Sequence, residues 1–165
     1  MGNFLRLLVL SLMMVPVAQA QSLLPGDKVP DFSLPSANGG WGQRLSEQKG
    51  QPLMVIWTDR CNRCEEELAR YQLLAESHAL DGLVSWIVWT PYKSDRPPLM
   101  RLPVLENNEK WRTGWDFNPK PAVMLIDADG TLRHLFTGNL QRQYDQVENL
   151  MAGWVSTQKR AEQTP

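Results

Sequence analysis

The chain has 165 residues, of which 42% are hydrophobic and 21% charged, with a formal net charge of −1. This length and composition predict one globular domain with its own core, and the charge gives no reason to expect a nucleic-acid partner. The two cysteines, Cys61 and Cys64, are too few for a disulfide scaffold.

The first twenty residues have the features of a secretory signal peptide. Arg6 provides a positive charge, Leu7 to Val15 is apolar apart from one serine, and Ala18-Gln19-Ala20 has the form of a cleavage site. We expect cleavage after residues 1–20 and a soluble protein in the periplasm or another extracytoplasmic space. An uncleaved anchor is the alternative, although the apolar stretch is about half of the ~20 residues that span a bilayer.

Residues 21–50 are rich in proline, glycine, serine and asparagine. The turn signal Asn38-Gly39-Gly40 predicts an irregular hairpin from Asp31 to Leu45. We expect this segment to cover the domain without contributing chemistry.

A strand, a helix and a second strand follow. Leu53 to Trp57 is a continuous apolar run, Cys61 to about His78 has helical spacing, and Leu83 to Trp89 is again apolar. These lengths predict a βαβ unit with two parallel, buried strands.

Cys61 and Cys64 stand in the spacing C-x-x-C where the first strand gives way to the helix. The partial positive charge at a helix N-terminus favours a thiolate, which is the nucleophile of disulfide exchange. We therefore expect Cys61 to attack and Cys64 to resolve the mixed disulfide. A purely structural bridge is a weaker hypothesis, because it would close a very small loop.

The second half of the chain begins with a proline-rich stretch. Thr90 to Pro119 contains five prolines and is predicted to be a loop with a short helix over Glu106 to Thr113. Val123 to Ile126, a turn at Asp129-Gly130 and Leu132 to Phe136 predict an antiparallel strand pair.

The last predicted helix runs from Tyr144 to about Thr157, with an apolar stripe along one side. A polar tail, which we expect to be frayed, follows over residues 158–165.

Three motifs match a known family. The first, P-G-x-x-x-P-x-F-x-L, is represented by Pro25, Gly26, Pro30, Phe32 and Leu34. The second is represented by Trp57, Cys61, Cys64 and Glu67, and the third, P-x-x-x-L-I-D-x-x-G, by Pro121, Leu125, Ile126, Asp127 and Gly130. In these motifs the chain resembles the TlpA-like branch of exported thioredoxins, which includes ResA and DsbE type proteins. The resemblance implies an α/β thioredoxin fold over residues 21–157, with a central mixed β-sheet flanked by helices and an N-terminal hairpin extension.

The resemblance also implies further site residues. Pro121 would be a cis-proline that faces the cysteines, and Lys120 would line the groove for a client chain; an ordinary trans proline on an edge strand is the alternative. Trp57 would support the site from its strand. Glu67 would assist proton transfer, or it would be a solvated glutamate of the first helical turn.

The chain departs from the family pattern around the cysteines. Arg60 replaces the usual tryptophan, Asn62-Arg63 separates the cysteines, and Ala69 replaces a proline. Arg60 and Arg63 add positive charge, which would favour the thiolate and make the pair more oxidising, whereas the adjacent glutamates oppose this. If both arginines are simply exposed, their ion pairs contribute little. The direction of electron flow therefore stays open.

The hypothesis is an extracytoplasmic thiol:disulfide oxidoreductase. It would exchange disulfides with client proteins, need no organic cofactor and no metal, act as a monomer and be reset by a membrane-bound thiol redox partner.

Three alternatives remain. A peroxiredoxin-like peroxidase is suggested by Thr58-x-x-Cys61, although Met54 stands where that motif has proline. A Cu(I)-handling protein would use the two thiolates and His134. A binding module without catalysis would use some of the seven tryptophans.

Overall fold

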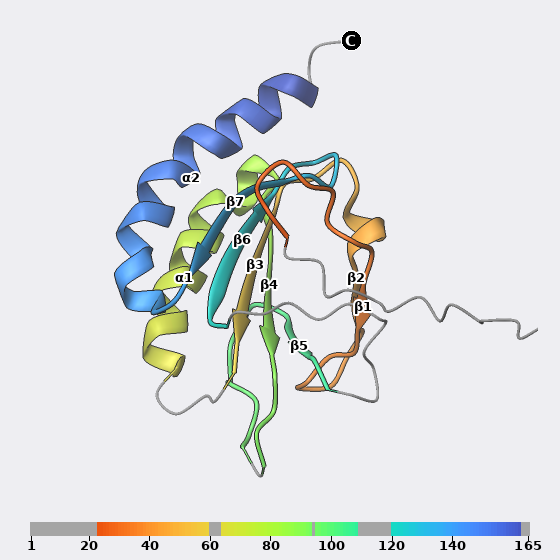
Figure 1. The fold of residues 1–165 in the computed structure, drawn as a ribbon, viewed down its shortest axis with the longest axis vertical. Coiled ribbons are helices and arrows are strands. Elements are labelled where there is room, and N and C mark those ends of the chain that lie inside the picture. Colours follow the sequence, from red (N-terminus) through yellow and green to blue (C-terminus); the bar gives the residue numbers. More distant parts are fainter. Residues whose placement is uncertain (1–22, 60–63, 94, 109–119, 163–165) are drawn as a thin grey trace, which may run out of the picture.

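The computed structural model describes residues 23–59, 64–93, 95–108 and 120–162. They form a five-stranded mixed sheet, a small two-stranded hairpin and two α-helices (Figure 1). The strand order of the large sheet is β5-β4-β3-β6-β7.

The three strands on one side of this sheet are parallel to one another: β3 (Leu53–Thr58), β4 (Val84–Trp89) and β5 (Val104–Glu106). β6 (Ala122–Ile126) is antiparallel to β3, and β7 (Leu132–Thr137) is antiparallel to β6. The helix α1 (Cys64–His78) and the short 3-10 helix η2 (Ala79–Asp81) connect β3 to β4. The predicted βαβ unit and the antiparallel pair are therefore confirmed.

The sheet separates two apolar clusters. Met54 and Ile56 of β3 face α1 and α2 (Leu140–Glu162), whereas Val55 and Trp57 face the N-terminal segment. Figure 1 shows the helices on one face and that segment on the other. Because every residue of β3 is buried, the alternation of side chains along this strand supplies both clusters.

The N-terminal segment also closes one edge of the sheet. Its hairpin, β1 (Ser33–Leu34) with β2 (Gln43–Arg44), is followed by the 3-10 helix η1 (Leu45–Gln48), which confirms the predicted hairpin. Ala37 N donates to Val104 O at 2.8 Å, and Glu106 N donates to Pro35 O at 2.9 Å. These bonds satisfy backbone groups of β5 that an open edge would leave unpaired.

The predicted helix from Glu106 is wrong at its start. Glu106 ends β5, and Val104 and Leu105, both buried, lie opposite Ile87 and Val88 of β4. A strand of three residues directly after Pro103 is too short to give a periodic signal, so pairing with β4 decides its structure. The remainder of that predicted helix, residues 109–113, lies outside the described residues.

The last helix is longer at both ends than predicted. α2 begins at Leu140, where Asn139 Oδ1 accepts a hydrogen bond from Arg142 N at 3.0 Å and so caps the first turn. It continues to Glu162, so the expectation of a frayed chain from Gln158 is wrong.

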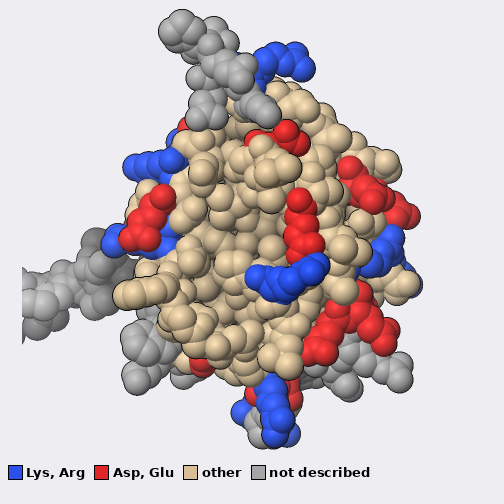
Figure 2. All heavy atoms as spheres, turned by 180° about the vertical axis from the view of Figure 1, so that it is seen from behind, with Lys and Arg blue, Asp and Glu red and all other residues tan. Residues whose placement is uncertain are grey.

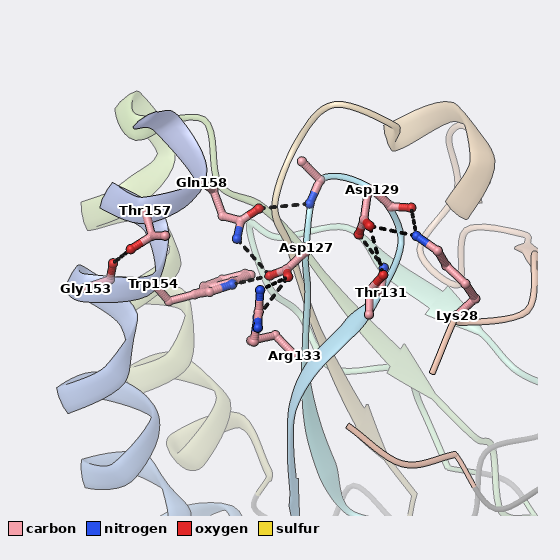
Figure 3. Close-up of polar contacts among 10 residues, drawn as sticks. Lys28, Asp127, Asp129, Thr131, Arg133, Gly153, Trp154, Thr157 and Gln158 are labelled. Carbon is pink, nitrogen blue, oxygen red and sulfur yellow. Dashed lines mark hydrogen bonds and ion pairs between the residues drawn. The ribbon is translucent and has the colours of Figure 1, made fainter. Parts of the chain in front are cut away.

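Asp127 fixes the end of α2 to the sheet (Figure 3). One carboxylate oxygen accepts hydrogen bonds from Trp154 Nε1 at 2.7 Å and Gln158 Nε2 at 2.9 Å. The other pairs with the guanidinium of Arg133, and Gln158 Oε1 accepts from Ala128 N. The polar residue Gln158 is thus held by the turn that follows β6.

Charges on the face seen in Figure 2 are mixed, with basic and acidic side chains interspersed among the other residues. In the part of the chain that is described, no helix is long and apolar enough to cross a membrane. The predicted signal peptide, residues 1–20, lies outside that part.

Candidate active site

Cys64 is the first residue of α1, close to the C-terminal end of the central strand β3. Its side chain is 7% exposed, it packs in the helix-side cluster, and its sulfur is part of a disulfide. The chain contains one other cysteine, Cys61, which lies outside the described residues together with Arg60 and Arg63. A sulfur this buried can react with a neighbouring sulfur but is poorly accessible to an incoming protein.

Pro121 lies at the same end of the sheet, beside the C-terminal end of β3. The Lys120–Pro121 peptide bond is cis, as the resemblance implied. The next residue, Ala122, lies opposite Trp57, and Pro121 O accepts a hydrogen bond from Gly138 N at 3.0 Å. The register therefore brings the proline turn beside the end of β3, and Figure 1 shows this end, the start of β6 and the start of α1 together.

Trp57 anchors the end of β3 from the opposite face. It is 2% exposed, its indole nitrogen donates to Met124 Sδ at 3.0 Å, and its ring lies 5.7 Å from that of Phe32. Lys120 Nζ lies 5.9 Å from the centroid of the indole ring. Trp57 thus contacts both the core and the lysine that precedes the cis bond.

The three glutamates that follow Cys64 have different surroundings. Glu65 accepts a hydrogen bond from Leu99 N at 3.2 Å, and Glu66 is exposed. Glu67 is half-buried and lines a cavity of about 390 Å³ between the two helices. The sequence could not separate these three residues. In the structure Glu66 also lines the cavity, and Glu67 is the one of the three that is half-buried.

Tyr71 forms the floor of that cavity, one turn beyond Glu67. Its hydroxyl donates to Leu140 O at 2.8 Å, and burial raises the pKa of this phenol. Arg70 stacks on Tyr144 of α2, with its guanidinium carbon 3.8 Å from the ring centroid. These contacts hold the middle of α1 against the first turns of α2.

Sequence reasoning missed Gln143, which is 7% exposed and lies in the first turns of α2. A Cβ on Gly138 would lie 3.5 Å from Nε2 of Gln143. The Gln143 amide is therefore next to the residue that donates a hydrogen bond to Pro121. Within the structure as described, neither its nitrogen nor its oxygen has a hydrogen-bond partner. Gln143 and Val147 are four residues apart and so lie on the same side of a helix. This spacing would have indicated that Gln143 is buried only if the helix had been predicted to begin before Tyr144.

Two residues of the copper hypothesis, Cys64 and His134, lie in different parts of the fold, and the third, Cys61, lies outside the described residues. His134 lies opposite Leu125 in the middle of the β6–β7 pair and stacks on Phe136, with 6.2 Å between ring centroids. It is therefore not at the end of the sheet where α1 begins. The described residues contain no group of three or more histidine, cysteine, aspartate or glutamate side chains that could hold a metal ion.

Comparisons with known proteins identify the fold. No family model matches the chain, and no curated protein matches its sequence. Among solved structures, a candidate thiol:disulfide interchange protein DsbE from Chlorobium tepidum is 18% identical with a TM-score of 0.64, covering 81% of this chain and 99% of that one. An exposed lipoprotein thioredoxin from Streptococcus pneumoniae is 21% identical with a TM-score of 0.53, covering 71% and 99%.

A reduced 2-Cys peroxiredoxin from Plasmodium vivax is also similar, with 13% identity, a TM-score of 0.61 and coverage of 80% of this chain and 81% of that one. At such identities the likeness establishes the fold alone. The chain therefore has the thioredoxin fold, an α/β fold with a central mixed sheet.

Proposed function

We propose that the protein is a thiol:disulfide oxidoreductase that exchanges disulfides with client proteins outside the cytoplasm. The observation that carries this proposal is the position of Cys64. It is a buried, disulfide-bonded cysteine at the first residue of a helix. The cis bond before Pro121 lies at the same end of the sheet, where β3 ends.

The low exposure of Cys64 supports different roles for the two cysteines, one that attacks the client and one that resolves the mixed disulfide. A client disulfide needs an accessible nucleophile, and 7% exposure makes Cys64 unsuited to that step. Cys61, three residues earlier, would be the attacking group, since a helix N-terminus favours its thiolate. Arg60 and Arg63 would add to this effect.

The exchange balances within the two proteins. The Cys61 thiolate attacks one sulfur of the client disulfide, a mixed disulfide forms, and the other client sulfur leaves as a thiolate. The Cys64 thiolate then attacks Cys61, which releases the second client thiolate and leaves a Cys61–Cys64 disulfide. Two electrons have passed to the client, and the reverse sequence would oxidise a client dithiol.

Other groups would assist these steps. Glu67, half-buried one turn from Cys64, would accept the proton of the resolving thiol. The backbone of Lys120 would pair with the client chain beside the cis bond. No organic cofactor is required, and a membrane-bound thiol partner would restore the starting redox state.

Insulin reduction tests the proposal. We expect Cys61→Ser to abolish turnover and Cys64→Ser to stop it after one step, leaving a trapped mixed disulfide that can be identified by mass spectrometry. Unchanged turnover in both variants would refute the proposal. A reduced protein that consumed hydrogen peroxide much faster than it reduced insulin would favour the peroxidase alternative.

A further inference from the structure

Two large apolar side chains project into solvent near the candidate active site. Trp41, at the tip of the β1–β2 hairpin, is 92% exposed, and Leu99, in the connection from β4 to β5, is 82% exposed. Tyr92, which follows the end of β4, is 44% exposed. Neither Trp41 nor Leu99 belongs to an apolar cluster of the described residues, so stability alone does not account for their presence.

Hydrogen bonds connect both positions to the start of α1. Asn38 Nδ2, in the hairpin tip, donates to Pro98 O at 2.9 Å. The next residue, Leu99, donates its backbone N–H to Glu65 Oε1 at 3.2 Å. Glu65 directly follows Cys64, so the two hydrogen bonds connect the hairpin tip to the first turn of α1. Figure 1 shows the hairpin tip extending toward the same end of the sheet as the start of α1.

The backbone around Trp41 is fixed by its neighbours. Gly39 and Gly40 have φ values of 81° and 97°, which favour glycine, and Ser36 Oγ donates to Gly39 O at 2.7 Å. On the other side, a Cβ on Gly42 would lie 2.6 Å from Leu34 O, so only glycine fits this close approach. The hairpin therefore presents Trp41 from a defined turn.

We propose that Trp41, Leu99 and Tyr92 form a docking surface for extended, apolar segments of client proteins next to the cysteines that exchange. This inference rests on the proposed function and names the kind of client that the site would take. Leu99 lies beside the start of α1, because its backbone N–H bonds to Glu65, the residue after Cys64.

The size of the surface favours a client segment over a second copy of this chain. Large aromatic side chains bury about 150–250 Å² each, so three side chains offer a few hundred square ångströms. Stable protein–protein interfaces bury about 1,200–2,000 Å² in total. A small apolar surface suits a complex that must dissociate after each exchange.

The test separates docking from chemistry. The probe is dye-labelled insulin B chain with carboxymethylated cysteines, which can bind but cannot exchange disulfides, and the readout is fluorescence anisotropy. We expect the double variant Trp41→Ser/Leu99→Ser to bind about tenfold more weakly than the wild type, as removal of central apolar contacts usually does. Because both side chains are exposed, the variant should remain folded, which circular dichroism would verify.

The matched control is Leu73→Ser/Leu80→Ser, which removes two leucines that are 62% and 98% exposed, on the second half of α1 and in η2. We expect its affinity to stay within twofold of the wild type. Equal affinity of the Trp41→Ser/Leu99→Ser variant and the wild type, an equal loss in both double variants, or no wild-type binding would overturn the inference. Insulin reduction by the same wild-type preparation tests the proposed function separately.

Discussion

Asp127 provides the sharpest test of how the sheet and α2 are held together. Its side chain is 8% exposed at the end of β6, and one oxygen accepts hydrogen bonds from Trp154 and Gln158 (Figure 3). The other oxygen pairs with Arg133, whose side chain is 57% exposed. The perturbation is Asp127→Ala, which removes the acceptor and leaves the indole N–H without a partner.

The expected loss follows from these contacts. A hydrogen bond to a charged group contributes about 1.5–3 kcal/mol, and two such bonds come from the indole and the amide. The exposed guanidinium adds at most about 1 kcal/mol, because solvent screens it. We take the lower part of each range and expect the free energy of unfolding to fall by about 3–4 kcal/mol. For a domain of this size that corresponds to a decrease in Tm of about 10 °C.

Urea unfolding followed by circular dichroism measures the change, with Asp145→Ala as the control. Asp145 is 80% exposed and lies 3.6 Å from Arg70, so its loss should change the free energy of unfolding by less than about 0.5 kcal/mol. A loss below about 1 kcal/mol for Asp127→Ala would refute the reasoning. Trp154→Phe, which keeps an aromatic side chain but removes the N–H donor and part of the buried ring, should cost about 1–3 kcal/mol.

Three further predictions concern single residues. Gln143→Met should raise the free energy of unfolding by about 1–2 kcal/mol, measured in urea, because it removes a buried amide that has no hydrogen-bond partner among the described residues. Gly42→Ala should lower it by about 1–3 kcal/mol, since the new Cβ would clash with Leu34 O. The hydrogen bond from Lys28 lowers the pKa of Asp129 to about 2. The stability advantage of wild type over Lys28→Met should therefore be complete above pH 4 and disappear as the pH falls towards 2.

Each of these predictions has a control and an opposing result. Gln141→Met changes an exposed glutamine and should have little effect; a clear loss in Gln143→Met would mean that its amide is paired in solution. Gly153→Ala, on α2 with open space around it, should stabilise by about 0.5–1 kcal/mol, so equal effects at both glycines would contradict the packing argument. For Lys28→Met, a difference that persisted unchanged at pH 2 would show that the ion pair is not its source.

The sequence predicts the parts of the fold that are apolar and continuous. β3 and β4 are runs of buried residues, and Asp129-Gly130 has the turn chemistry of a hairpin, so all three are correct. β5 was not predicted because a strand of three residues is too short to show an alternating pattern of apolar and polar side chains. The ends of α2 were misplaced because a cap at Asn139 and tertiary bonds at Gln158 decide them.

The same contrast applies to the candidate site. The spacing of the cysteines and the motif around Pro121 are local features, and the cis bond before Pro121 agrees with the resemblance. Leu99 and Gln143 become part of the site only through contacts with distant segments, which no local pattern encodes. The distinction between Glu65 and Glu67 also depends on the fold, because it requires knowing which loop covers α1.

The closed sheet edge has a consequence for how the chain acquires its structure. Residues 35–37 pair with β5, and Gly26 and Asp27 exchange backbone hydrogen bonds with Leu132. The first described part of the chain thus completes its bonding only with segments made about 70 to 100 residues later. Such distant pairing slows folding. A nascent chain therefore cannot complete the hydrogen bonds of its N-terminal segment until most of the protein has been synthesised.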